Sequence, residues 1–452
     1  MRTAPSLPKQ QRGALLILLV IALGILAATV FVGMLSSSAI QNERDKKTAA
    51  ALAEAKTALI GFAVGVDLTT TSQRPGDLPC PDLNNDGSAD PPCSSAASRL
   101  GRLPWKTLGL GDLRDGNGDR LWYAVSTNFK NSPRTGTLNS DQQGTITVRT
   151  SDGNVINNGA GSSAAIAVVF SPGAVITRDG AAQPQNRGCT RGSGNDSACL
   201  VNETCNSPYV ATAKCDPTNY LDLLVGTEDN ADFVDGDPNN GFINGIIRDP
   251  LDKEKIIVND KLITISYADI MPLLEKRVAK EVYRCLTDYA TQLQNNGRYP
   301  WAASLVATTN NPPDYSDVSG ELFGRLPDTF NYTVSNSGNS MKNGWTTDCN
   351  INIGNWWPNW RELVFYGLAD AYKPTFSMVT PPACGLCLQV APFSAANKQF
   401  VVIVAGKALS GQLRNPTSSN PSNYLEDPNA SMSNSYLQQK ATPSFNDLVL
   451  FR

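Results

Sequence analysis

The sequence contains no histidine among its 452 residues. Histidine is the commonest side chain in general acid–base catalysis and the commonest protein metal ligand. A Ser-His-Asp triad and a Cys-His nucleophile are therefore excluded. Carboxylate chemistry stays open because the chain has 41 acidic residues, but no acidic pair stands out as the catalytic pair of a glycosidase. We expect a protein that is not an enzyme, with an exported hydrolase that uses carboxylates as one alternative.

Charged residues are also scarce, at 17% of the chain against roughly 25% in ordinary soluble domains. The 38 Lys and Arg residues nearly balance the 41 acidic ones, so the net charge is -3. Nucleic-acid binding needs a basic surface, so this composition predicts no nucleic-acid partner. Hydrophobic residues make up 41%, enough to bury a substantial core. The length allows about two or three domains.

One stretch, residues 14–34, carries no charge and consists mainly of Ala, Leu, Ile, Val and Gly. As a helix with a rise of about 1.5 Å per residue, it would reach about 30 Å, the thickness of a bilayer core. Arg2, Lys9 and Arg12 precede it, and cations before a span favour keeping that end in the cytoplasm. We predict a transmembrane segment over residues 14–34, with a cytoplasmic N-terminus and a periplasmic head.

A cleaved signal peptide is the alternative interpretation of this N-terminus. The apolar core of a signal peptide normally has about 7–15 residues and is followed by small residues at the cleavage site. The present run is longer, but residues 36–39, Ser-Ser-Ser-Ala, resemble such a site. A plain single-span anchor is a third interpretation.

Helical character continues beyond the apolar run. Residues 40–64 contain no proline and only one glycine. Leu52, Ala55, Leu59 and Phe62 recur at spacings of three and four, which places them along one face of a helix. We predict one helix from about residue 14 to residue 64, with its first half in the membrane and its second half on a globular head.

The order of parts at the N-terminus resembles that of a known family. Residues 9–13, Lys-Gln-Gln-Arg-Gly, end a short basic leader, which the apolar run and the amphipathic extension follow. This arrangement is similar to that of type IV pilins and of the pseudopilins of type II secretion. The resemblance implies that a prepilin peptidase cuts after Gly13 and methylates Ala14. It also implies a single-pass protein of the bacterial inner membrane whose partners are other pilin or pseudopilin subunits, that membrane and the prepilin peptidase.

The fifth position after the cleavage site departs from the family pattern. Pilins usually carry Glu there, which in the family is thought to pair with the N-terminal amine of a neighbouring subunit, whereas this chain has Leu18. Burying a carboxylate without that partner in lipid is costly, so a subunit that lacks the neighbour has reason to lose the acid. The large tip-proximal pseudopilin of type II secretion also lacks it. Leu18 favours a minor or tip position over a shaft position, and it also argues against incorporation into a filament.

Short segments of the chain recur in the same order, which indicates an internal duplication. Gly-Arg-Leu-Pro occurs at residues 101–104 and again at 324–327. Asn-Tyr-Leu followed by an acid occurs at residues 219–222 and 423–426. The other matching pairs are 78–80 with 299–301, 121–125 with 364–368, and 166–170 with 401–405.

A second amphipathic helix is predicted over residues 268–293, where Ile270, Leu274, Val278 and Val282 share one stripe. The order helix, strands, helix, strands predicts an α+β fold with two tandem modules. In each, a helix would lie on a small antiparallel sheet, which is also the plan of a pilin head. The predicted division is a basic prepilin-type leader at 1–13, the transmembrane half of the helix at 14–34, a first pilin-like module at 35–255 and a second at 256–452.

Ten cysteines, an even number, all follow the apolar run. Disulfides persist in oxidising compartments, so their placement fits an exported head. Cys384 and Cys387 form Cys-x-x-Cys, for which we predict a disulfide, with redox catalysis and metal binding as alternatives. The other predicted pairs are Cys80 with Cys93 and Cys285 with Cys349, whereas the four cysteines from 189 to 215 allow three pairings.

The loop between Cys80 and Cys93 is rich in acids and contains Asp-x-Asn-x-Asp-Gly. This spacing is typical of the start of a calcium loop, although Cys93 stands at the twelfth position, where such a loop has Glu. The alternative is a set of ordinary turns, because Asp and Asn side chains bond their own backbone. Residues 115–119 repeat the spacing. Calcium is the one cofactor that the sequence suggests, with Asp82, Asn84, Asp86 and Asp90 as candidate ligands.

Three tryptophans follow one another closely at Trp356, Trp357 and Trp360. Tryptophan anchors interfaces and stacks on sugars, but it equally fills cores. Both a partner surface and a core cluster are therefore consistent with this segment.

These observations favour a structural minor pilin or pseudopilin-like subunit of a type IV pilus or type II secretion system. It would act by helix assembly and by contacts of its head with partners. The alternatives are a membrane-anchored periplasmic adhesin or glycan-binding protein and an exported hydrolase that uses carboxylates.

Overall fold

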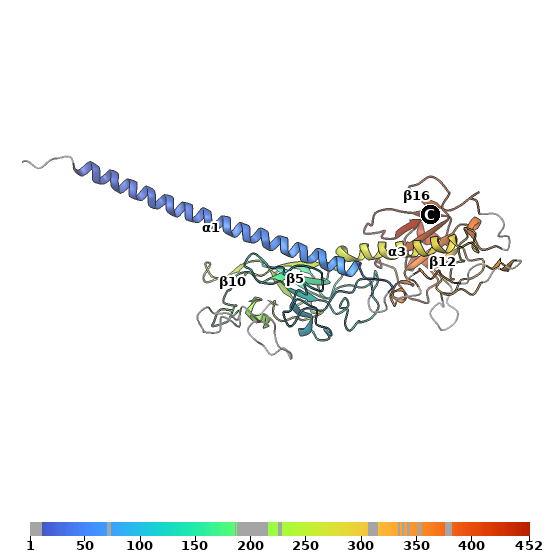
Figure 1. Cartoon of the computed structure of the whole chain (residues 1–452), viewed down its shortest axis with the longest axis horizontal. Helices are drawn as coiled ribbons and strands as arrows, with labels where there is room; N and C mark the ends of the chain where they lie inside the picture. The colour runs from blue at the N-terminus through green and yellow to red at the C-terminus, as the bar shows by residue number, and fades with distance from the viewer. Residues whose placement is uncertain are drawn as a thin grey trace, which may run out of the picture.

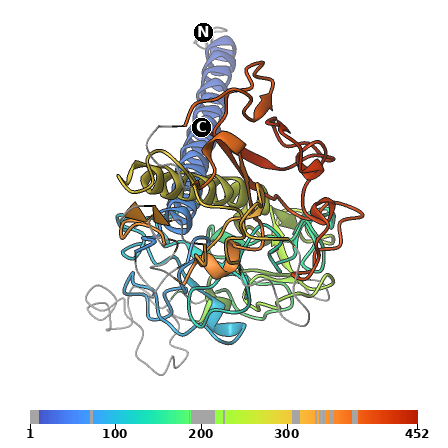
Figure 2. The same cartoon turned by 90° about the vertical axis from the view of Figure 1, so that its right-hand side faces the viewer.

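The computed structural model describes residues 11–69, 74–185, 187, 216–224, 228–305, 315–332, 335–336, 339–340, 344–349, 351, 355–375 and 382–452. For residues 11–37, 228, 335–336 and 339–340 it describes only the backbone. A long helix, α1 (Gln11–Val64), extends from the molecule as a rod, and two globular modules lie in a row at its other end (Figure 1). Seen from the second module, α1 runs away from the head toward the N-terminus (Figure 2).

The helix α1 is unbroken over 54 residues. The continuous helix predicted from about residue 14 to residue 64 is therefore present, and it begins three residues earlier, at Gln11. Its sequence has no proline, and its glycines are separated from one another, so nothing in it interrupts the hydrogen-bond ladder of a helix.

The structure contradicts the prediction of a transmembrane segment. Within the part of the chain that the structure describes, no helix has the length and apolarity needed to cross a membrane. The side chains of residues 14–34, where the span was predicted, lie outside the described residues. Where the side chains of α1 are described, charges at residues 43–47 and at Lys56 interrupt its apolar character. The predicted single-pass location in the inner membrane falls with the span, and the resemblance to pilins loses that part of its support.

The first module is built on a four-stranded antiparallel sheet of β1 (Leu100–Arg102), β2 (Trp122–Val125), β5 (Ala167–Ser171) and β11 (Lys261–Ile265). The second half of α1 packs against β5 and β11. All of β2 and β5 is buried, which is why these strands are rich in apolar residues rather than alternating in polarity.

The second module repeats this plan with β12 (Phe323–Arg325), β15 (Val364–Leu368), β17 (Phe400–Val404) and β19 (Leu448–Phe451). The helix α3 (Tyr267–Thr291) packs on β17 and β19, as α1 packs on β5 and β11. At its start, the Asp269 carboxylate accepts hydrogen bonds from the backbone N–H and the hydroxyl of Ser266. An acid in the first helical turn also favours the positive end of the helix dipole.

Smaller elements surround the two sheets. In the first module these are β3 (Val148–Thr150) between β4 (Val155–Asn157) and β8 (Phe242–Asn244), the pair β6 (Leu223–Leu224) and β7 (Glu228–Asp229), the pair β9 (Ile247–Arg248) and β10 (Ile256–Val258), and the 3-10 turns η1 (Ala97–Arg99) and η2 (Pro217–Asn219). In the second they are the pair β13 (Ser335–Asn336) and β14 (Asn339–Ser340), the parallel pair β16 (Gln389–Ala391) and β18 (Ser435–Leu437), the short helix α4 (Trp357–Trp360), and the turns η3 (Asp370–Tyr372), η4 (Pro421–Asn423) and η5 (Asn429–Ser431).

The two modules meet at Ser266 rather than between residues 255 and 256. The strand β11 completes the first sheet, yet it lies beyond the predicted end of the module at residue 255. The stretch from residue 229 to residue 244, rich in Asp, Asn and Gly, resembles a linker in sequence. In the structure it runs from β7 to β8 and belongs to the first module.

Matching hydrogen bonds establish which residues of the two modules correspond. The Tyr123 hydroxyl donates to Pro79 O, and the Tyr366 hydroxyl donates to Pro300 O, each at 3.2 Å. This agrees with the predicted matches of 78–80 and 121–125. The predicted match of 166–170 with 401–405 is two residues out of register. Ala167 of β5 pairs with Val125 of β2, and Phe400 of β17 pairs with Leu368 of β15, so Ala167 corresponds to Phe400.

Candidate functional site

The place where α1 joins the head is formed by one apolar face of the helix. Ala55, Leu59 and Ala63 are fully buried there, and Leu52 is almost so. Of the predicted stripe, Leu52, Ala55 and Leu59 lie in this core, whereas Phe62 is only partly buried and Ala63 takes the inner position. We call this buried face of α1 (Thr48 to Ala63), with β5, β11 and the start of α3, the seat of the helix.

Ion pairs fix α1 along its seat. The Lys56 ammonium lies 2.8 Å from the Asp269 carboxylate of α3 and donates to Thr264 O at 3.0 Å. About three turns toward the N-terminus, the Asp45 carboxylate lies 2.7 Å from the ammonium of Lys261, which begins β11. These contacts join α1 to the fourth strand of the first sheet and to the first turn of α3. They therefore set both the position of α1 along its axis and its rotation.

A glycine loop packs against α1 near the point where the helix leaves the head. The Gly116 N–H donates to the Thr48 hydroxyl at 3.0 Å. A Cβ atom at Gly116 would lie 2.1 Å from the Arg44 carbonyl oxygen, so no larger residue fits without moving the helix. Asp115 shapes this loop, because its carboxylate accepts from the N–H groups of Asn117 and Asp119 and from the Ser171 hydroxyl. The second predicted calcium-like spacing is thus a turn that rests on α1.

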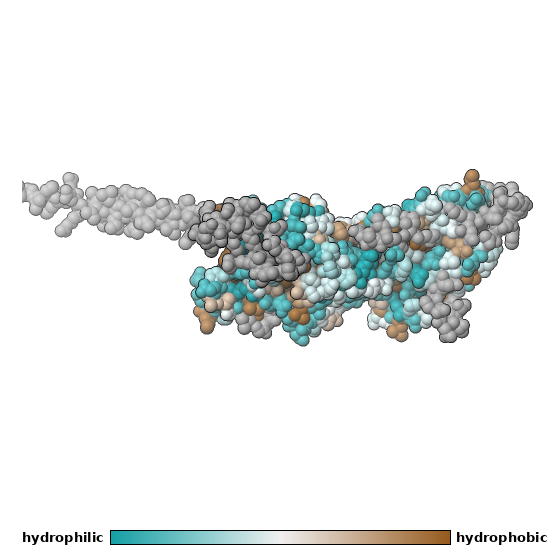
Figure 3. Space-filling view, turned by 60° about the horizontal axis from the view of Figure 1, so that its bottom comes forward, coloured by the Kyte–Doolittle hydropathy of each residue, from teal (hydrophilic) through white to brown (hydrophobic). Residues whose placement is uncertain are grey.

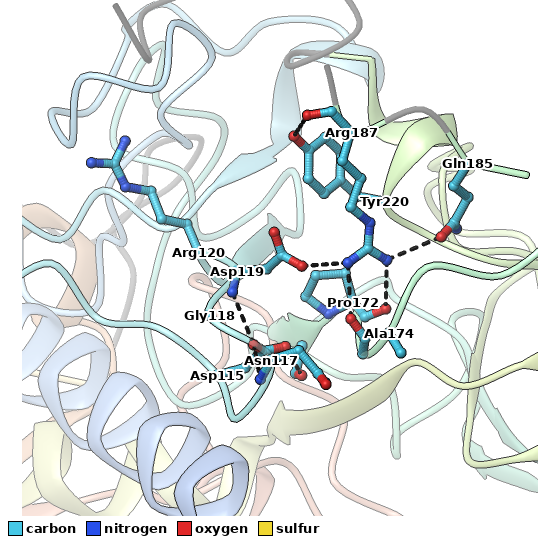
Figure 4. A network of polar contacts seen from close by, with 12 residues as sticks. Asp115, Asn117, Gly118, Asp119, Arg120, Pro172, Ala174, Gln185, Arg187 and Tyr220 are labelled. Atoms are coloured by element: carbon cyan, nitrogen blue, oxygen red, sulfur yellow. Dashed lines mark hydrogen bonds and ion pairs between the residues drawn. The ribbon is translucent and has the colours of Figure 1, made fainter. Parts of the chain in front are cut away.

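Figure 4 shows how this loop is anchored to the rest of the first module. The Arg187 guanidinium donates to the Asp119 carboxylate, to the Gln185 side chain and to the carbonyl oxygens of Pro172 and Gly173. Burial raises the pKa of Asp119, and the nearby Arg187 charge opposes that rise. The loop that supports α1 is consequently tied to the end of β5 by charge-assisted hydrogen bonds.

The acid-rich loop between Cys80 and Cys93 has the turn arrangement that the sequence left as an alternative to calcium binding. The Asp82 carboxylate accepts from the N–H groups of Asp86 and Gly87, and the Asp90 carboxylate accepts from that of Leu83. Asn84 and Asp86 likewise cap turns, accepting from the N–H groups two residues ahead. Burial raises the pKa of Asp82 to about 6.

Metal binding receives no support from this geometry. In the described ranges, no cluster of three or more Asp, Glu, His or Cys side chains is arranged to hold a metal ion. The four candidate ligands Asp82, Asn84, Asp86 and Asp90 direct oxygens to backbone amides instead. Calcium binding stays a prediction from spacing.

Three disulfides join cysteine pairs that the sequence analysis names. Cys80 pairs with Cys93 and closes the acid-rich loop. Cys285 of α3 pairs with Cys349 and ties that helix to the segment before α4. Cys384 pairs with Cys387. The four cysteines from 189 to 215 lie outside the described residues.

The tryptophan cluster lies in the core of the second module. Trp356 and Trp360 are fully buried and Trp357 is 3% exposed. The partner-surface interpretation of Trp356, Trp357 and Trp360 is therefore wrong, because side chains this deeply buried cannot meet a sugar or a protein partner. The sequence could not decide this point, since the same residue type fills cores and anchors interfaces.

Each module contains a pair of adjacent carboxyl groups next to its fourth strand, and sequence reasoning missed both. Asp222, Asp260 and Asp447 are buried, whereas Glu426 is partly exposed. In the first module, the Asp222 carboxylate accepts from the N–H groups of Asn259 and Asp260, and the Asp260 carboxylate accepts from the N–H of Asp222 and from the Asn230 amide. The second module repeats the arrangement with Glu426, Asp447 and Asn429. The recurring Asn-Tyr-Leu-acid segments were the available signal.

Burial dominates the electrostatics of these pairs. It raises the pKa of Asp222 to about 6, and burial together with the Asp222 charge raises the pKa of Asp260 well above its usual value. Burial and the charge of Glu426 raise the pKa of Asp447 in the same way. The causes named act against ionisation of Asp222, Asp260 and Asp447, because burial and a neighbouring negative charge both disfavour the charged form of a carboxyl group.

The contacts described fix one half of a long helix on a disulfide-bonded head and leave the other half extending from it (Figure 1). No family model, curated protein or solved structure matches this chain.

Proposed function

We propose that this chain is a structural subunit that assembles with other copies or related subunits through the first half of α1. It would carry its two-module head outward, as a minor pilin or pseudopilin of a pilus or secretion system does. The proposal includes no catalytic role. The observation that carries it is the division of α1 into a half seated on the head and a half, residues 11–37, that extends away from it (Figure 1).

The composition of the extending half supports assembly. Residues 14–34 carry no charge, and burial of apolar surface stabilises by about 25 cal/mol per Å². Helices of this composition gain the most free energy when they pack against one another, because contact of so long an apolar run with water is unfavourable. The same segment of another copy offers a matching apolar surface of equal length.

The surface of the head is consistent with this assignment. On the face shown in Figure 3, hydrophobic residues lie singly among polar ones instead of forming one broad patch. Strongly exposed apolar residues such as Leu251, Leu386 and Leu413 are far apart in sequence. On this face the scattered apolar residues form no large docking patch, whereas residues 14–34 form one uncharged run.

Processing of the N-terminus tests the pilin-type version of the proposal. We expect the mature chain, isolated from the cells that make it, to begin at Ala14 and to carry one methyl group on that residue, as mass spectrometry of the intact protein would show. Gly13→Ala should block the cut and leave the leader attached, whereas Gln11→Ala should be processed normally. A mature protein that starts at Met1, or one cut near residue 39, would exclude this version.

The two alternative functions lack a comparable observation. Glycan binding depended on the tryptophan cluster, which is buried. A carboxylate hydrolase needs two exposed acids that face a common cleft. The pairs Asp222 with Asp260 and Glu426 with Asp447 are hydrogen bonded to backbone amides. Asp90, Asp216 and Asp232 do share a cavity, but Asp90 and Asp216 accept hydrogen bonds from backbone N–H groups there.

A further inference from the structure

A cavity of about 530 Å³ opens on the first module, between the acid-rich loop and the residues around η2 and β7. Sites for small ligands and single side chains commonly have volumes of about 300–1,000 Å³. The cavity lies apart from the seat of α1, so the proposed assembly does not account for it.

The walls of this cavity are apolar and rigid. Pro91, Pro92 and Pro217 line it together with Leu83 and the ring of Phe233. Phe233 is held in place, because its ring stacks on that of Phe242 at 5.6 Å and it is only 4% exposed. Proline rings present apolar surface without losing conformational entropy on binding. The walls therefore suit an alkyl chain.

The charged groups of the cavity are mostly acidic. Asp90, Asp216 and Asp232 line it, and Asp232 is exposed to solvent. Asp216 uses one carboxylate oxygen, Oδ1, to accept from the N–H of Thr218 at the start of η2. The cation that also lines the cavity, Arg102, is 5% exposed.

Arg102 does not offset these acids at the surface. Its guanidinium lies between the rings of Trp122 and Tyr220, 4.1 and 3.9 Å from their centroids. Arg99, close to the same loop, is paired with Asp235 at 2.8 Å. A ligand that enters the cavity therefore meets carboxylates rather than cations.

The second module shows that the fold does not require the acid-rich loop. Asp82 and Arg102 exchange backbone hydrogen bonds in the first module, and Ala303 and Arg325 exchange the same bonds in the second. At the corresponding place the second module thus has alanine, and Trp301 stands where Cys80 of the Cys80–Cys93 disulfide stands. In sequence, the corresponding residues 301–315 of the second module contain no cysteine and a single acid, Asp314.

We propose that this cavity binds a primary ammonium group carried on an alkyl chain, the chemistry of a lysine side chain or of a free diamine. The alkyl chain lies against the prolines and Phe233, and the ammonium group lies near Asp232 and Asp216. Binding here does not depend on assembly through α1, so either proposal can fail without the other.

Calorimetric titration of the full chain with Nα-acetyl-lysine N-methylamide tests this inference. The neutral norleucine analogue is the ligand control, and cadaverine serves as the free diamine. If the natural ligand is a lysine side chain, the lysine derivative should bind, and if it is a free diamine, cadaverine should bind. In either case the norleucine analogue should bind at least tenfold more weakly. Asp232→Asn should weaken binding about three- to fivefold, the range of a partly exposed ion pair.

Two further variants separate the cavity from general surface charge. Asp152→Asn removes an exposed acid elsewhere on the first module and should leave affinity unchanged. Ala97 is exposed and lines the cavity, so Ala97→Phe should fill the space and abolish binding while the melting temperature stays the same. The inference is overturned if neither amine binds, if norleucine binds equally well, or if Asp152→Asn weakens binding as much as Asp232→Asn.

Discussion

Replacing Leu59 by alanine is expected to lower the free energy of unfolding by about 3–4 kcal/mol. Leu59 is fully buried in the middle of the seat, where α1, the first sheet and the start of α3 meet. Truncation removes apolar contacts and leaves a cavity between three elements that cannot easily close. Urea denaturation of the full chain, followed by tryptophan fluorescence, measures this loss.

Thr57 provides the matched control for Leu59. It lies on the same turns of α1 but is exposed, and its hydroxyl only donates back to Ala53 O within the helix. Thr57→Ala should therefore change the free energy of unfolding by less than about 0.5 kcal/mol. If Leu59→Ala were equally mild, α1 would not be seated on the head in solution.

Replacing Asn429 or Asn230 by alanine is expected to cost about 3–5 kcal/mol each. The Asn429 amide donates to the Asp447 carboxylate and to Leu437 O, and its carbonyl oxygen accepts from Leu437 N–H. Asn230 makes the same three bonds, with Asp260 and with both peptide groups of Ile243. Alanine would leave a buried carboxyl group and two backbone groups without these partners, and desolvated polar groups without partners are costly.

The equivalence of the two modules makes this prediction specific. Thermal and urea unfolding of the two variants should give losses that agree within about 1 kcal/mol, because the bonds are the same. Asn397→Ala, at an exposed position of the second module, should have almost no effect. A loss below about 1 kcal/mol for either buried asparagine would mean that its carboxyl pair does not hold the module together.

The parts of the fold that sequence reasoning captured depend on contacts that are local or that recur. Leu52, Ala55 and Leu59 indicate a buried helical face because their spacing is that of a helix. The repeated Gly-Arg-Leu-Pro marks β1 and β12 because each copy has the same role in its own sheet. The predicted disulfide pairs enclose short loops or link a helix to its own module.

The parts of the fold that sequence reasoning missed depend on contacts between residues that are far apart in the sequence. Asp115 and Ser171 are 56 residues apart, and Asp222 and Asp260 are 38 apart, with nothing in either segment to point to the other. The same acids that suggest calcium ligands in sequence become turn caps once their backbone amides are near. The boundary at Ser266 was missed because β11 follows a polar stretch that resembles a linker.

The most direct test of assembly through α1 is cross-linking between copies. Val30→Cys places a thiol in the uncharged run, and Ser419→Cys places one on an exposed loop of the second module. After mild oxidation of the assembled protein, we expect covalent dimers on a non-reducing gel for Val30→Cys and almost none for Ser419→Cys. Val30→Cys that stays monomeric, or dimers that form equally well through Ser419→Cys, would contradict assembly through this half of the helix.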